Sequence, residues 1–269
     1  MSAGQAGADY YLMEDGVVFL RRWGRRWVVW ITLKGALRLT AAVLAIALVW
    51  TLLTYGDERT ARTWKTWATP LSGKTIALDA GHGGVDGGAV SKQGVVEKDL
   101  NMAIALYLRD YLQQAGALVV MTREGDYDLA APDTKTYSRR KTEDLHKRVN
   151  VIKESQPHLV VSIHMNSIPS AKWSGAQTFY NPANHRGSKL LAAAIQNEIK
   201  RNLENTSRVA ATENSVYLLK AITDVPTALI EVGFLSNPGE AARLADSEYQ
   251  RKVAASIYQG LLRYAAGEK

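Results

Sequence analysis

Apolar and polar positions divide the chain into a short uncharged stretch near the N-terminus and a longer part in which two patterns alternate. Residues 39–55, LTAAVLAIALVWTLLTY, carry no charge, which predicts an apolar helix. From residue 74 onward, short runs rich in β-branched residues alternate with longer amphipathic segments. This alternation predicts an α/β fold, a single domain with a twisted, largely parallel sheet flanked by helices.

The second part of the chain predicts strands and helices in a regular order. Strands are expected at residues 75–78, 117–123, 159–164, 175–180, 215–220 and 227–234, and helices at 99–116, 138–155, 185–205 and 238–267. The helix at 99–116 has one apolar stripe, which includes Leu100, Ile104 and Leu108, and Gly116 suits its C-terminal end. Residues 56–73 are polar and predict an irregular tether before the first of these strands.

Composition and charge narrow the classes of function. The absence of cysteine excludes thiolate metal sites, cysteine nucleophiles and disulfides. Nine of the 33 Lys/Arg residues and five of the 26 Asp/Glu residues lie within residues 1–66, so a net +4 of the total +7 belongs to this segment. We find no basic run with interleaved aromatic residues in the remainder, which argues against nucleic acid as a partner.

The charges around the apolar stretch predict a membrane anchor. Acidic Asp57 and Glu58 follow it, and six cations precede it: Arg21, Arg22, Arg25, Arg26, Lys34 and Arg38. By the positive-inside rule, residues 1–38 form a cytoplasmic basic segment, 39–55 a transmembrane signal anchor, 56–73 a linker, and 74–269 a catalytic domain outside the cytoplasm. Two alternatives are a cleaved signal peptide and a buried helix of a soluble protein. The long segment before the stretch and the lack of an A-x-A site just after it disfavour the first, and the charge asymmetry disfavours the second.

Four ionisable side chains lie at or just beyond the ends of the predicted strands. His82 follows the first strand in the glycine-rich segment DAGHGGVDGGA, and His164 ends the strand LVVSIH. Glu231 lies in TALIEVGF, and Glu97 lies where the chain enters a helix. Because sites in open α/β sheets form beyond the carboxyl ends of the strands, we expect these side chains to converge. Two imidazoles and one carboxylate are the composition of a catalytic zinc site, and a second carboxylate can transfer protons. Spacing alone leaves open which glutamate binds metal.

These segments resemble the successive motifs of a known family, the zinc-dependent N-acetylmuramoyl-L-alanine amidases of the Amidase_3 type. The matching segments are DAGHGGVDGGA, the isolated Glu97 before a helix, SIHMNS and EVGFLSN, and the resemblance extends from about residue 74 to the C-terminus. It implies that His82, Glu97 and His164 bind one Zn²⁺ per chain and that Glu231 is the catalytic carboxylate. It also implies peptidoglycan as the substrate and hydrolysis of the amide between N-acetylmuramic acid and L-alanine.

The domain arrangement, one short anchor followed by a catalytic domain alone, is similar to that of the germination-specific, spore-cortex members of this family. Those enzymes remove stem peptides as a step toward muramic δ-lactam. Some cell-separation amidases of the family carry a long inhibitory insertion where this chain has only NPANHRG between a strand and the next helix. A built-in blocking helix is therefore not expected, and control by a protein partner is left open.

Two other functions and the role of one arginine also stay open. The first alternative is another zinc hydrolase of the wall polymer, such as a carboxypeptidase. Such an enzyme would need a cationic side chain that binds the terminal carboxylate of its substrate. A non-catalytic wall-binding module is the second alternative, although such a module could lose a ligand, and all four site residues are present. Arg148, in the predicted helix 138–155, is either a helix-surface or carboxylate-pairing residue or a substrate contact.

Overall fold

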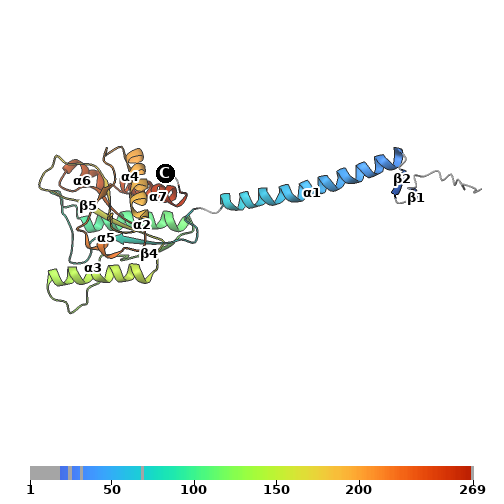
Figure 1. The fold of residues 1–269 in the computed structure, drawn as a ribbon. Helices are drawn as coiled ribbons and strands as arrows, with labels where there is room; N and C mark the ends of the chain where they lie inside the picture. The colour runs from blue at the N-terminus through green and yellow to red at the C-terminus, as the bar shows by residue number, and fades with distance from the viewer. Residues whose placement is uncertain (1–18, 24–25, 31–32, 68–69, 268–269) are drawn as a thin grey trace, which may run out of the picture. The chain divides into compact units, whose positions relative to one another are not determined.

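The chain divides into two compact units, Met1–Trp67 and Ala68–Lys269. The computed structural model describes residues 19–23, 26–30, 33–67 and 70–267 (Figure 1). In the first unit, strand β1 (Phe19–Trp23) pairs antiparallel with β2 (Arg26–Trp30), and helix α1 spans Leu33–Trp67. The β1–β2 hairpin was not predicted from the sequence.

Helix α1 contains the predicted apolar stretch. Its segment Lys34–Thr51 is long and apolar enough to cross a membrane. The side chains of Ile46 and Trp50 are each 68% exposed, so within its own unit α1 is not a core helix. The irregular tether predicted at 56–73 is wrong as far as Trp67, because α1 continues to that residue. The segment is rich enough in Ala, Arg, Glu and Lys to extend a helix, and its first proline is Pro70.

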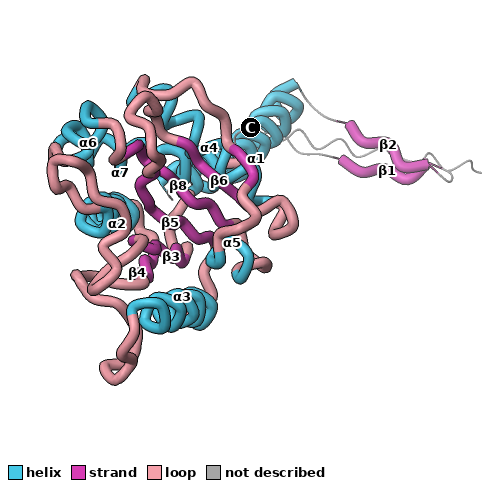
Figure 2. The backbone as a smooth tube through the Cα atoms, turned by 90° about the vertical axis from the view of Figure 1, so that its left-hand side faces the viewer, coloured by secondary structure: helices cyan, strands magenta, loops and turns pink. Residues whose placement is uncertain are grey.

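A six-stranded sheet forms the centre of the second unit, in the order β4-β3-β5-β8-β6-β7 (Figure 2). All neighbouring strands are parallel except β6 and β8, which are antiparallel. The strands are β3 (Thr75–Ala80), β4 (Leu118–Met121), β5 (Leu159–Asn166), β6 (Gln177–Tyr180), β7 (Ala211–Thr212) and β8 (Thr227–Phe234). The predicted α/β fold with a largely parallel sheet is therefore confirmed.

Helices cover both faces of this sheet (Figure 2). Helices α2 (Glu97–Gln114) and α4 (Gly187–Leu203) pack on the sheet, and α7 (Ser247–Ala265) packs against both of these helices. Helix α3 (Tyr137–Glu154) packs with the short α5 (Tyr217–Ala221). The predicted stripe of α2 faces the core, where Ile104 and Leu108 are fully buried. A smaller apolar cluster, which includes Val149, Val160 and Leu218, lies beneath α3 and α5.

Two predicted elements were wrong. Residues 215–220 were expected as a strand, but 217–221 form α5, whose Leu218 packs with Ile222 one turn later. A short apolar run does not distinguish strand from buried helix, so periodicity could not decide this segment. The single helix expected at 238–267 is two helices, α6 (Pro238–Leu244) and α7, because the Asp246 carboxylate caps α7 by accepting a hydrogen bond from the Tyr249 amide at 2.8 Å.

Candidate metal centre and active site

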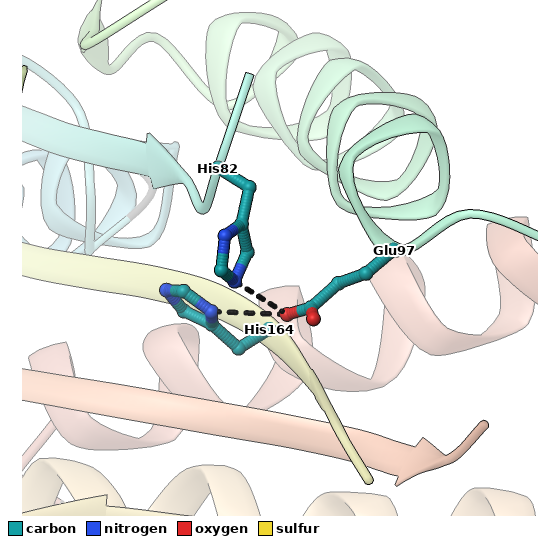
Figure 3. A group of neighbouring side chains, drawn as sticks. All are labelled: His82, Glu97 and His164. Carbon is teal, nitrogen blue, oxygen red and sulfur yellow. Dashed lines mark hydrogen bonds and ion pairs between the residues drawn. The ribbon is translucent and has the colours of Figure 1, made fainter. Parts of the chain in front are cut away.

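Three elements bring His82, Glu97 and His164 together (Figure 3). His82 lies just beyond β3, Glu97 is the first residue of α2, and His164 lies in β5. Glu97 Oε1 is 3.2 Å from His82 Nε2 and 3.1 Å from His164 Nδ1. One potential ligand atom from each residue lies within 4.8 Å of the others, so this triad has the geometry and donor types to hold a metal ion.

The glycines around His82 are required by the close approach of the other two side chains. A Cβ atom on Gly81 would lie 2.2 Å from the His164 ring, and one on Gly88 would lie 2.6 Å from Glu97 Oε2. His82 itself has a φ of 63°, a left-handed conformation that side-chain-bearing residues rarely adopt. The glycine-rich loop thus leaves room for the three potential ligand side chains to meet, and its backbone conformation directs the His82 imidazole toward the other two.

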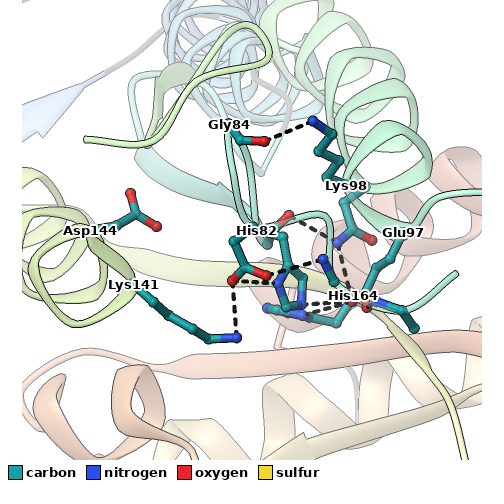
Figure 4. Close-up of polar contacts among 12 residues, drawn as sticks. His82, Gly84, Glu97, Lys98, Lys141, Asp144 and His164 are labelled. Atoms are coloured by element: carbon teal, nitrogen blue, oxygen red, sulfur yellow. Dashed lines mark hydrogen bonds and ion pairs between the residues drawn. The ribbon is translucent and has the colours of Figure 1, made fainter. Parts of the chain in front are cut away.

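Asp86, which the sequence reasoning did not single out, supports His82 from the outer side. Its Oδ2 atom lies 2.9 Å from His82 Nδ1, so His82 Nε2 is the nitrogen that faces Glu97. Lys141 of α3 (Figure 4) also pairs with Asp86, at 3.0 Å. Tyr137 donates a hydrogen bond to Asp86 at 2.9 Å. Burial favours a neutral Asp86, but these neighbours hold its pKa well below the ordinary range. Asp86 is a carboxylate four residues after His82 in the sequence, and this spacing could have indicated that the two side chains meet.

The same contacts set the charge of the triad. Burial lowers the pKa of His82, but the carboxylates of Asp86 and Glu97 outweigh it and raise that pKa to about 9. Burial raises the pKa of Glu97, yet His164 and His82 hold it well below the usual range. Glu97 is only 3% exposed and accepts hydrogen bonds from the amides of Ala89 at 2.8 Å and Met165 at 3.0 Å. Its carboxylate is therefore ionised and held in one orientation.

Glu231 lies beside this triad rather than within it. It is paired in register with His164 across β5 and β8, and it lines a cavity of about 180 Å³ together with both histidines. Burial raises the pKa of Glu231 to about 6. Its Oε2 atom is buried without a hydrogen-bond partner among the described residues. A partly buried carboxyl group that has one unpaired oxygen and a pKa near neutrality is the kind of group that accepts and releases protons.

Two buried arginines, Arg148 and Arg123, donate hydrogen bonds to groups at the end of β3 and in the residues that follow it. Arg148 of α3 donates to the carboxylates of Asp79 at 2.9 Å and Asp144 at 2.7 Å, and to the His82 carbonyl at 2.5 Å. Arg123 donates to the Gly81 carbonyl at 3.1 Å. Arg148 is 1% exposed, so its helix-surface alternative is wrong and its carboxylate pairing is confirmed. Burial raises the pKa of Asp79, but Arg148 and neighbouring hydroxyls lower it to about 2.

Comparison with known proteins places this arrangement among amidases. Residues 76–263 match the family model Amidase_3, described as N-acetylmuramoyl-L-alanine amidase. Over 201 residues the chain is 56% identical to the germination-specific N-acetylmuramoyl-L-alanine amidase of Bacillus subtilis (strain 168), covering 75% of this chain and 84% of that protein.

Solved structures give the same result. The chain is similar to the CwlD amidase from Clostridioides difficile in complex with the GerS lipoprotein, with a TM-score of 0.70 and 42% identity, over 72% of this chain and 100% of that one. It is also similar to the N-acetylmuramoyl-L-alanine amidase from Clostridium difficile 630, with a TM-score of 0.64 and 31% identity, over 74% of this chain and 100% of that one.

Proposed function

The chain belongs to the Amidase_3 family of N-acetylmuramoyl-L-alanine amidases, a metal-dependent family, and we propose that His82, Glu97 and His164 hold one Zn²⁺ ion while Glu231 acts as the catalytic carboxylate. The reaction is hydrolysis of the amide that joins N-acetylmuramic acid to L-alanine in peptidoglycan. The observation that carries the division of roles is that Glu97 contacts both imidazoles, whereas Glu231 lines the adjoining cavity with an unpaired oxygen.

The donor set favours zinc as the metal. Two imidazole nitrogens and one carboxylate oxygen, with a position left for water, are a common ligand set of catalytic zinc sites. The contact between Asp86 and His82 Nδ1 fits this assignment, because a carboxylate on the outer nitrogen fixes the ring and increases the basicity of the inner one. When bound, Zn²⁺ supplies an acidified water and polarisation of the scissile carbonyl.

Glu231 moves protons in this proposal. With a pKa of about 6, it is ready to accept a proton from water and later donate one to the leaving nitrogen of L-alanine. The surrounding apolar residues, which include Leu218 and Leu229, limit the access of bulk water to this carboxyl group. The positions of His82 and His164 are fixed on strands of the sheet or directly after them, so the proton carrier and the triad keep a constant spacing.

We place the substrate in the spore cortex. The 56% identity to a germination-specific amidase, over 84% of its length, supports this setting. The enzyme would remove stem peptides there as a step toward muramic δ-lactam. The relative from Clostridioides difficile was solved with a lipoprotein bound, which supports a search for a similar protein partner.

The apolar part of α1 anchors the enzyme to the membrane in this proposal. The exposed segment Lys34–Thr51 and its basic N-terminal flank support an uncleaved anchor at residues 39–55, preceded by a cytoplasmic segment at 1–38. Residues 56–73 then link the anchor to the catalytic domain at 74–269, outside the cytoplasm.

Product analysis on intact peptidoglycan tests the proposed function. Purified full-length protein with Zn²⁺ should release peptides that begin with a free L-alanine amino group, and it should contain one zinc per chain. Release of C-terminal D-alanine alone would support the carboxypeptidase alternative instead. Binding to peptidoglycan without any cleavage, with and without a candidate lipoprotein, would support the wall-binding module.

A further inference from the structure

A second hollow, which we call the Lys92 hollow, is formed by three loop segments next in sequence to Glu97, His164 and Glu231. Its volume is about 340 Å³, and it shares no lining residue with the cavity of Glu231. The lining comes from the hairpin before Glu97, the loop after His164 and the turn after Glu231, and includes Val90, Lys92, Ser167, Ser170, Leu235 and Ser236. The hollow is therefore a second recess, separate from that cavity and built from the same segments that carry Glu97, His164 and Glu231.

The walls of the Lys92 hollow are held by hydrogen bonds within the chain. In the hairpin, the Ser91 amide donates to the Val95 carbonyl at 2.8 Å, and the Ser91 hydroxyl accepts from the Val95 amide at 3.1 Å. Across the other wall, the Leu235 amide donates to the Asn166 carbonyl at 2.9 Å. A ligand would thus enter a largely formed recess and would spend little binding free energy on ordering its loops.

The chemistry of the hollow differs from that of the triad. Lys92 is exposed, and no carboxylate lies within ion-pair distance of it in the described part of the chain. By contrast, Lys98 pairs with Asp126 at 2.7 Å and Lys141 pairs with Asp86 at 3.0 Å. Three serines and several apolar residues, which include the 58% exposed Val90, Ile168 and Pro169, complete the lining. An unpaired cation with serines and apolar side chains around it suits a short peptide that carries a carboxylate.

We propose that the Lys92 hollow binds the stem-peptide side of the substrate and that Lys92 pairs with a peptide carboxylate. This inference rests on the proposed function. The two sides of the scissile amide differ in charge: the lactyl carboxyl of N-acetylmuramic acid is consumed in the amide, so the glycan side is neutral there, while the stem peptide carries free carboxylates. The cation of the hollow therefore distinguishes the peptide side from the glycan side.

Paired substrates test the inference on the full-length protein. Two synthetic muropeptides would differ only in whether the residue after L-alanine bears a carboxylate or the corresponding carboxamide. For Lys92→Gln we expect kcat/KM to fall about threefold to fivefold on the carboxylate substrate, mainly through KM, with no change on the carboxamide. Lys92→Glu should lose about tenfold or more on the carboxylate substrate, because like charges then face each other. Added salt should reduce the wild-type preference for the carboxylate.

A matched charge reversal separates this effect from a general change in electrostatics. Lys252→Glu, at an exposed position of α7, should leave both substrates unaffected. Equal losses on both substrates for the Lys92 variants, or no loss on either, would overturn the inference while wild-type cleavage upholds the amidase assignment. If wild-type protein with bound zinc cleaves neither substrate, the proposed function itself fails, and this inference fails with it.

Discussion

Glu97 and Glu231 lie at the same edge of the sheet in different surroundings, and their substitutions should have different effects. Glu97→Ala removes an oxygen that contacts both imidazoles, so zinc per chain should fall and the free energy of unfolding should fall with it. Glu231→Gln keeps the shape of the side chain but not its proton transfer, so zinc should stay bound while the hydrolysis rate falls about 10²- to 10⁴-fold. Metal analysis and rate measurements on the same preparations check both expectations.

Glu154→Gln, on the exposed side of α3, is a suitable control and should change neither quantity. A small shift in metal affinity for Glu231→Gln is compatible with the assignment, since the change removes a negative charge near a dication. If Glu231→Gln were metal-free while Glu97→Ala kept both zinc and activity, the two roles would be reversed.

His82 should make the stability of the metal-free protein depend on pH. Its pKa in the folded protein, about 9, lies above the ordinary value of 6.5. The stabilisation from the charged imidazole is therefore fully present below pH 6.5 and is lost as the pH rises through about 9, at a cost of at most about 3 kcal/mol. Denaturant unfolding with a chelator should show this loss in wild type and a smaller one in His82→Gln. Zinc affinity should rise over the same interval, because binding needs the neutral ring. A wild-type profile as flat as that of the variant would rule out this role.

Site residues could be predicted from the sequence where their position depends on the strand that carries them. His82, His164 and Glu231 lie at or just past predicted strands, so the direction of those strands was enough to bring them to one edge. The supporting role of Arg148 was not predictable, because it reaches the His82 carbonyl 66 residues away. The i, i+4 spacing indicates the pairing of Arg148 with Asp144, but its contacts with Asp79 and the His82 carbonyl depend on how α3 packs on β3.

At the level of elements, α3 is fixed to the end of β3 largely through Arg148. Arg148→Lys keeps the charge but loses the forked geometry that meets Asp79, Asp144 and the His82 carbonyl at once. We expect the free energy of unfolding to fall by about 3 kcal/mol, since breaking a buried ion pair leaves a carboxylate uncompensated. Zinc affinity should fall too, because the loop of His82 loses its support.

Arg139→Lys, at an exposed position of the same helix, is the matched control for that experiment and should be nearly neutral. Unfolding curves and competition with a metal chelator measure the two effects separately. Should Arg148→Lys bind zinc as tightly as wild type after correction for unfolded protein, Arg148 would be a stabilising residue without influence on the metal site.

The two elements that were predicted wrongly have different physical causes. Residues 217–221 are apolar enough for a buried strand, but the segment packs as helix α5 against α3 and β8. The break between α6 and α7 depends on one carboxylate cap at Asp246 within a run that favours helix throughout. Long amphipathic helices and strands in the sheet centre were found correctly, because their periodicity extends over enough residues to be decisive.

At the scale of the whole molecule, the catalytic residues and the apolar helix belong to different units. Every residue of the candidate site lies in the unit Ala68–Lys269, which has its own hydrophobic core, and the family match at residues 76–263 lies entirely within it. The apolar helix α1 belongs to the other unit, Met1–Trp67. Its segment Lys34–Thr51 is long and apolar enough to cross a membrane, and in the proposed topology its orientation decides on which side of the membrane the enzyme acts.

A reporter that is active only in the cytoplasm tests this orientation. Arginines and Lys34 flank the N-terminal side of the apolar segment, while Asp57 and Glu58 follow residue 55, so the catalytic unit should lie outside the cytoplasm. A fusion after Lys269 should give no signal, whereas a fusion after Arg38 should give a strong one. Deletion of residues 39–55 should restore the signal of the first fusion, because export then fails. Immunoblotting of the exported protein should detect an N-terminal tag at full length if the anchor stays uncleaved. Strong cytoplasmic activity of the intact Lys269 fusion would contradict this topology.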